Sequence, residues 1–128
     1  MEPHAPRLLL VEDDPHIRRL LVASLRRTAW KVDEAPTGEA ALDLLKGDPY
    51  DAVLLDLILP QLGGFRICQH IRELDGEKPF IIMMTADDSD EAREMASDCG
   101  VDQFLPKPFL VEELLKSLAP VLMKVMHQ

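Results

Sequence analysis

Short, uninterrupted runs of apolar residues alternate along the chain with longer stretches in which apolar residues recur every three or four positions. The short runs predict five strands, over residues 8–11, 30–35, 52–55, 80–84 and 103–105. Most of these runs lack polar alternation, which is typical of parallel strands covered on both faces. The run over 30–35 is partly polar and predicts a strand toward the edge of the sheet.

The longer stretches predict five amphipathic helices. In chain order they are expected from residue 15, from 38 to 47, over 65–74, over 87–98 and from residue 109. Asp14 and Pro15 are typical of a helix start, because a capping side chain is followed by proline in the first turn. Pro120 is expected to kink or break the last helix, since proline lacks the amide hydrogen that a helix interior uses.

Strands and helices thus alternate five times. This order predicts an α/β fold in which a parallel, doubly wound sheet carries helices on both faces. No internal repeat, linker or output domain is recognised in the 128 residues, so the chain is interpreted as one domain over 1–128. In such folds ligands bind beyond the carboxyl ends of the strands, which makes the residues after each strand the candidates for function.

Composition narrows the classes of function. The 14 Lys+Arg and 23 Asp+Glu give a formal net charge of −9, which disfavours direct binding to nucleic acid or to an anionic membrane surface. No apolar run approaches the ~20 residues that cross a bilayer, and no secretory signal is recognised. Two unpaired thiols at Cys68 and Cys99 are favoured over a disulfide. We therefore expect a soluble, cytoplasmic protein.

Polar residues follow four of the predicted strands. They are, in chain order, Glu12, Asp13, Asp14, Asp56, Thr85 and Lys107. If the first and third strands are neighbours, Glu12, Asp13 and Asp56 converge, and their mutual repulsion favours binding of a cation. Oxygen ligands without Cys or His favour a hard ion such as Mg²⁺. Asp14 is interpreted as a helix cap rather than a ligand.

The same residues fit phosphoryl chemistry. A carboxylate can accept a phosphoryl group in a covalent step, and Asp56 lies at the centre of the predicted sheet. A cation, Lys107 and Thr85 would then stabilise the charge on the phosphoryl oxygens. The glycine-rich loops GxGxxG and GxxxxGK(S/T), which bind nucleotide phosphates, do not occur in the sequence.

Four segments of the chain resemble the signature segments of receiver domains of two-component response regulators. They are LLLVEDD (8–14), DAVLLDLILP (51–60), MMTA (83–86) and KPF (107–109). The resemblance covers residues 7–125 in the family's order and spacing. It implies a flavodoxin-like fold with strand order 2-1-3-4-5 and five helices, and a signalling switch rather than a turnover enzyme.

The resemblance also implies a role for each site residue. Asp56 would be the phosphoacceptor, taking a phosphoryl group from a histidine of a sensor histidine kinase or a histidine phosphotransfer protein. Glu12 and Asp13 would place Mg²⁺ (or Mn²⁺). Asp56 and the backbone carbonyl of Ile58 would complete the protein ligands.

A conformational switch is implied as well. Thr85 would move toward the phosphoryl group, Lys107 would pair with that group, and the ring of Phe104 would turn inward. The Lys107–Pro108 peptide bond is expected to be cis. The fourth helix, fifth strand and fifth helix would form the signalling face, and a homodimer through this face is left open.

Some positions depart from the usual pattern of the family. Gly63 stands where an acid or Asn is more usual, which would loosen the loop after Asp56. Ile58 and Asp87 fall at the variable positions that tune the lifetime of the phosphoryl group. Four arginines form a basic stripe on the first helix, interpreted as a solvated face or alternatively as a kinase-docking surface: Arg18, Arg19, Arg26 and Arg27.

Two other functions are left open by the sequence. A degenerate receiver would act only as a dimerisation or interaction module, although every expected site residue is present. A Mg²⁺-dependent aspartyl phosphohydrolase would carry a second Asp two residues after its nucleophile, and this chain has Ile58 there. The receiver interpretation is therefore preferred.

Overall fold

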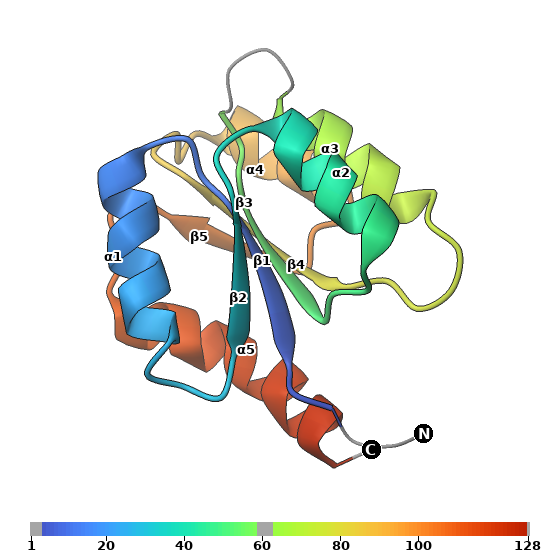
Figure 1. Ribbon diagram of the computed structural model, residues 1–128. Coiled ribbons are helices and arrows are strands. Elements are labelled where there is room, and N and C mark those ends of the chain that lie inside the picture. Colours follow the sequence, from blue (N-terminus) through green and yellow to red (C-terminus); the bar gives the residue numbers. More distant parts are fainter. Residues whose placement is uncertain (1–3, 59–62, 128) are drawn as a thin grey trace.

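The computed structural model describes residues 4–58 and 63–127. Within them the chain forms one five-stranded parallel sheet in the order β2-β1-β3-β4-β5 (Figure 1). This order confirms the predicted doubly wound topology. Part of the loop predicted over 59–64 lies outside the described residues.

The five strands agree closely with the apolar runs of the sequence. They are β1 (Arg7–Val11), β2 (Lys31–Ala35), β3 (Ala52–Asp56), β4 (Phe80–Thr85) and β5 (Gln103–Pro106). Asp56 and Thr85, which were expected just after their strands, are the last residues of β3 and β4. Their side chains are therefore fixed by strand pairing as well as by the loops that follow.

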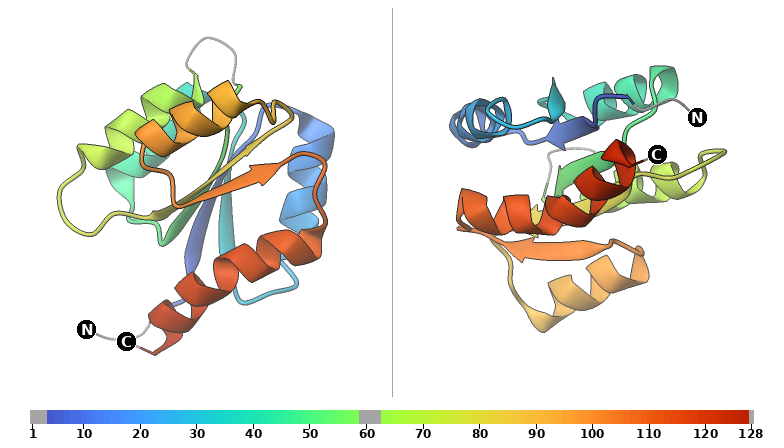
Figure 2. Two further views of the ribbon diagram at one scale, coloured as in Figure 1. Left: turned by 180° about the vertical axis from the view of Figure 1, so that it is seen from behind. Right: turned by 90° about the horizontal axis from the view of Figure 1, so that it is seen from below.

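Five helices within residues 4–58 and 63–127 cover the two faces of the sheet. They are α1 (Pro15–Leu25), α2 (Gly38–Gly47), α3 (Gly64–Arg72), α4 (Asp90–Asp98) and α5 (Val111–Met126). Helices α1 and α5 bury their apolar residues against one face, and α2, α3 and α4 against the other (Figure 1). Seen from behind, β5 is the outer strand, with α4 and α5 on opposite sides of it (Figure 2).

The central strands are buried on both faces, which explains why their sequences do not alternate. Along β1, Leu9 and Val11 pack toward α2, α3 and α4, whereas Leu8 and Leu10 pack toward α1 and α5. All four side chains have no exposed surface. Strand β2 lies at the edge of the sheet and is only partly buried, as its polar residues predicted.

Three helices differ from the predictions. Helix α3 runs from Gly64 to Arg72 rather than over 65–74. Helix α4 begins at Asp90 rather than at residue 87, because the hydroxyl of Ser89 accepts a hydrogen bond from Ala92 N and caps the helix there. Helix α5 begins at Val111 and continues past Pro120 to Met126, so the predicted break is wrong. Pro120 is exposed, and the carbonyl that it leaves without a helical partner belongs to the exposed Lys116.

Other expectations concern the backbone and the thiols. The Lys107–Pro108 peptide bond is cis. Cys68 and Cys99 are both free thiols. None of the helices within 4–58 and 63–127 combines the length and the apolar character needed to span a membrane.

Candidate functional site

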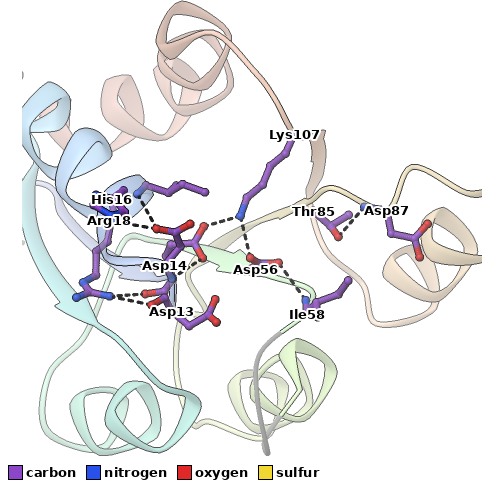
Figure 3. A network of polar contacts seen from close by, with 11 residues as sticks. Asp13, Asp14, His16, Arg18, Asp56, Ile58, Thr85, Asp87 and Lys107 are labelled. Atoms are coloured by element: carbon purple, nitrogen blue, oxygen red, sulfur yellow. Dashed lines mark hydrogen bonds and ion pairs between the residues drawn. The ribbon is translucent and has the colours of Figure 1, made fainter.

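The carboxyl ends of β1, β3, β4 and β5 bring the polar residues to one edge of the sheet (Figure 3). Val11, the last residue of β1, pairs with Leu55 of β3, so the residues that follow them, Glu12 and Asp56, lie side by side. Thr85 pairs with Pro106, the residue before Lys107. Parallel register alone therefore collects residues that are up to 95 positions apart in sequence.

Three carboxylates form the acidic part of this site. Ligand oxygens of Glu12, Asp13 and Asp56 all lie within 4.8 Å of one another. Glu12 has no exposed surface and Asp56 is 7% exposed, whereas Asp13 is exposed. An all-oxygen donor set of this size suits a hard divalent cation such as Mg²⁺. Asp13, on the solvent side, leaves the cation a route of access.

Lys107 connects two of these carboxylates. Its Nζ donates to Asp56 Oδ2 at 2.8 Å and also to Glu12 Oε1. The Lys107 backbone N donates to Thr85 O at 2.8 Å, which fixes the lysine at the end of β4. One ammonium thus offsets part of the negative charge of three acids, and the rest is available to attract a cation.

Burial affects the pKa values of both Glu12 and Lys107, the two charged residues of this contact. Burial raises the pKa of Glu12 above its ordinary value, and the hydrogen bond from Lys107 offsets only part of that rise. Burial alone would lower the pKa of Lys107, but its hydrogen bonds to Asp56 and Glu12 outweigh this and hold the pKa above its ordinary value. Lys107 therefore carries its full positive charge at neutral pH.

The backbone after Asp56 folds back over its carboxylate. The amide of Ile58 donates to Asp56 Oδ1 at 3.0 Å, while Lys107 binds Oδ2 (Figure 3). Both oxygens of Asp56 are therefore held by donors, which fixes the plane of the carboxylate.

Thr85 lies beside this group but does not touch Asp56. Its side chain is fully buried, and its Oγ1 accepts a hydrogen bond from Asp87 N at 3.1 Å. Within the described chain no hydrogen bond joins the Thr85 hydroxyl to Asp56 or to Lys107. The hydroxyl therefore belongs to the β4–α4 loop in this structure.

Phe104 lies on β5 and packs against the side of the core that α2, α3 and α4 cover. Its half-buried ring is stacked under the guanidinium of Arg93, 4.7 Å from the ring centroid. Arg93 Nε donates to Asp88 Oδ1 at 2.7 Å, so the β4–α4 loop, α4 and β5 are tied together at this point. This contact was not predictable from the sequence, because two residues that lie eleven positions apart on a helix and a strand leave no short-range pattern.

Asp14 is a helix cap, as the sequence predicted. Its Oδ1 accepts hydrogen bonds from His16 N at 2.8 Å and from Ile17 N at 3.3 Å. These contacts lower the pKa of Asp14 below its ordinary value. Asp14 is therefore turned toward α1 and is not part of the acidic cluster.

Two residues that support the site were not recognised from the sequence. Arg18 was placed on a basic stripe, but its Nη1 donates to Glu12 O at 2.9 Å. Its position one turn into α1 was the available signal, because long helical side chains lean back toward the amino end of their helix. Gly64 is needed because a Cβ there would lie 2.5 Å from Asp56 O.

Gly63, by contrast, has an ordinary conformation. Its φ is −66°, and it precedes α3 without a side-chain cap. A Cβ at Gly63 would meet nothing within 4 Å. The position next to Gly64 therefore has room for the larger residues that are more usual there.

Comparison with known proteins gives matches over nearly the whole chain. The model of the response regulator receiver domain matches residues 8–119. A response regulator, MprA of Mycolicibacterium vanbaalenii, is 40% identical over 116 residues, which are 91% of this chain and 50% of that protein. The chain therefore spans about half the length of the curated relatives it matches.

Solved structures show the same architecture. The non-phosphorylated HemR receiver domain of Leptospira biflexa is 33% identical, with a TM-score of 0.82 over 91% of this chain and 94% of that one. The receiver domain of a sensor histidine kinase from Pseudomonas aeruginosa PAO1 is 31% identical, with a TM-score of 0.85 over 94% and 99% of the two chains. That structure is described with a magnesium ion coordinated in its active site cleft.

Proposed function

The chain belongs to the response regulator receiver domain family, and we propose on this basis that it is a switch controlled by phosphorylation of Asp56. The observation that carries the proposal is the convergence of Asp56, two further carboxylates and Lys107 at one sheet edge. We propose residues 7–125 as the receiver unit and cytoplasm as its compartment. Sensor histidine kinases or histidine phosphotransfer proteins are the proposed donors.

The proposed reaction is a transfer from phosphohistidine to a carboxylate. An oxygen of Asp56 attacks phosphorus, the P–O bond forms and the P–N bond breaks. The electron pair of the P–N bond returns to the imidazole nitrogen, which takes up a proton. Lys107 is placed to stay paired with the phosphorylated aspartate, because it already binds Asp56 Oδ2.

Glu12, Asp13 and Asp56 fit a divalent cation, and the backbone carbonyl of Ile58 is the fourth proposed protein ligand. Mg²⁺ held there supplies positive charge opposite the oxygens of the transferred group. Glu12 is buried and bonded to Lys107, so it anchors the cluster, whereas the exposed Asp13 completes the ligand set from the solvent side. Mn²⁺ presents the same ligand preferences.

The conformational readout is proposed at Thr85 and Phe104. The Thr85 hydroxyl, which accepts a hydrogen bond from Asp87 N, would move toward the phosphoryl group and donate its own hydrogen to it. Phe104 must then leave the guanidinium of Arg93 to turn inward. The α4, β5 and α5 elements around these residues form the proposed signalling face, and a homodimer would use the same face.

The test is incubation with acetyl phosphate and Mg²⁺, followed by intact mass measurement. We expect one phosphoryl adduct on the unmodified chain and none on Asp56→Ala. Asp43→Ala, a change at an exposed acid of α2, should leave the adduct unchanged. No adduct on the unmodified chain, or an adduct that survives Asp56→Ala, would contradict the proposal.

The same assay separates the two rival functions. A degenerate receiver would form dimers and no adduct, which size-exclusion chromatography with the mass measurement detects. An aspartyl phosphohydrolase would release phosphate through many turnovers from a phosphate ester. The residue two positions after Asp56 is Ile58, whose side chain cannot act as a general acid, so we expect no such turnover.

A further inference from the structure

Arg18 of α1 reaches back to the loop that carries the acidic residues. Its Nη1 donates to the carbonyl oxygen of Glu12 at 2.9 Å, with a longer contact of 3.5 Å to that of Asp13 (Figure 3). Its Nε lies 3.5 Å from Glu34 Oε1 on the edge strand β2. The side chain is only 19% exposed. Arg18 thus connects the loop of residues 12 and 13 to β2, and we call this set of contacts the brace. Arg19, the arginine that follows it, is exposed.

The brace acts on the part of the site that is otherwise least restrained. Glu12 is buried and bound by Lys107, and Asp56 is the last residue of a central strand. Asp13 is exposed, and no side-chain hydrogen bond to its carboxylate occurs among the described residues. Repulsion from two neighbouring carboxylates would push Asp13 outward into solvent, and the fixed backbone of residues 12 and 13 opposes that movement.

The shape of the guanidinium group suits it to hold the backbone of residues 12 and 13. Its five N–H donors form a rigid planar fork, so it can bond two carbonyls and a carboxylate together. A lysine ammonium carries the same charge but has no such fork. The backbone N of Arg18 itself donates to Asp14 O at 2.9 Å, so both ends of the brace are fastened to the same short loop.

We propose that Arg18 is a positioning residue for the divalent cation: it holds the backbone of Glu12 and Asp13 so that their carboxylates face Asp56 before the ion arrives. This inference rests on the proposed function, whose cation site it refines. The charge of Arg18 acts in the opposite direction, because a nearby positive charge disfavours a second cation. Geometry and charge therefore predict changes of opposite sign when the residue is replaced.

The test measures Mg²⁺ affinity by isothermal titration calorimetry in Arg18→Lys, Arg18→Gln and the matched control Arg19→Gln. We expect both Arg18 variants to bind Mg²⁺ on the order of tenfold more weakly, as is usual when a group that orients metal ligands is lost. Arg19→Gln removes the same charge from the same helix and should bind as the unmodified chain does. At saturating Mg²⁺ the acetyl phosphate adduct should return to its full yield in both Arg18 variants.

Each alternative gives a distinct result. If only charge matters, Arg18→Lys binds Mg²⁺ normally and Arg18→Gln binds it more tightly, which would overturn the inference. A merely structural role would lower the melting temperature of the Mg²⁺-free variants and leave the dissociation constant unchanged, which also overturns it. If the unmodified chain itself binds no Mg²⁺, the proposed function fails instead.

A variant at Glu34 tests the same inference if the Arg18 variants do not fold. Glu34→Gln leaves Arg18 in place and removes its ionic partner on β2. We expect weaker Mg²⁺ binding in the same direction as for Arg18→Gln, but by a smaller factor. Normal affinity in Glu34→Gln, together with unfolded Arg18 variants, would contradict the proposed brace.

Discussion

The two glycines at the start of α3 meet different surroundings. A Cβ on Gly64 would lie 2.5 Å from Asp56 O and 3.0 Å from Leu57 Cα, and these are backbone atoms that cannot yield cheaply. A Cβ on Gly63 would meet nothing within 4 Å. Gly64 is thus required because the backbone of Asp56 and Leu57 lies against it, whereas the sequence suggested only that Gly63 would loosen the loop.

Gly64→Ala should therefore destabilise the protein by about 1–3 kcal/mol, the usual cost of forcing extra volume into a packed site. Because the clash is with Asp56 itself, Mg²⁺ affinity should fall as well. Gly63→Ala is the matched control and should change the free energy of unfolding by less than about 0.5 kcal/mol. Urea denaturation measures both, and equal losses in the two variants would contradict this account.

Some site residues were predictable because the residues next to them in the sequence identify their role. Asp14 was recognisable as a cap because Pro15 follows it, and the acids and Lys107 because they follow apolar runs. Arg18 and Gly64 act through backbone carbonyl oxygens, at Glu12 and Asp56. Such contacts depend on how the loops are placed in space. The position of Arg18 one turn into α1 indicates only that its side chain leans toward the preceding loop, and not which carbonyl oxygen it contacts.

At the scale of elements, the strands were predicted better than the helix ends. Burial on both faces produces apolar runs that begin and end with the strands, as in β3. The start of α4 was misplaced because Asp87, Ser89 and Asp90 are all good capping residues. The structure uses Ser89 as the cap, while Asp87 Oδ1 accepts a hydrogen bond from Ser89 N at 3.1 Å in the turn before it.

The proline within α5 leads to a prediction about stability. Pro120→Ala restores an amide that can donate to the carbonyl of Lys116 and removes the clash of the ring with the preceding turn. We expect the free energy of unfolding to rise by about 1–3 kcal/mol, because an interior proline costs a helix about 3 kcal/mol and this exposed position relieves part of that. Urea denaturation measures the change. A loss of stability would show that α5 needs Pro120 for its packing.

For the whole molecule, the net charge of −9 disfavours nucleic-acid and anionic-membrane binding but does not locate a site. Among the residues that the structure describes, only the carboxylates of Glu12, Asp13 and Asp56 form a cluster with the geometry of a cation site. The strand order was therefore needed to show which of the acids lie close enough together to bind a cation. It came from the family resemblance, because alternating strands and helices fit several orders of the sheet.

Mg²⁺ should therefore stabilise the folded protein as a whole. A ligand at ten times its dissociation constant adds about 1.4 kcal/mol to the free energy of unfolding, which for a domain of this size raises the melting temperature by about 5 °C. Differential scanning calorimetry measures the shift, with NaCl at matched ionic strength as the control for general screening. Asp13→Asn should reduce the shift, and an equal shift with NaCl would contradict a specific site.

The contact between Lys107 and Glu12 also has a consequence for how the protein forms. It closes a span of 95 residues, so the lysine can reach the acids only after the strands that carry them have docked in register. A chain still being synthesised, and shorter than residue 107, would hold the three acids without their counter-charge. The acids thus gain their counter-charge only after β5 has docked beside β4 and carried Lys107 to the same edge of the sheet.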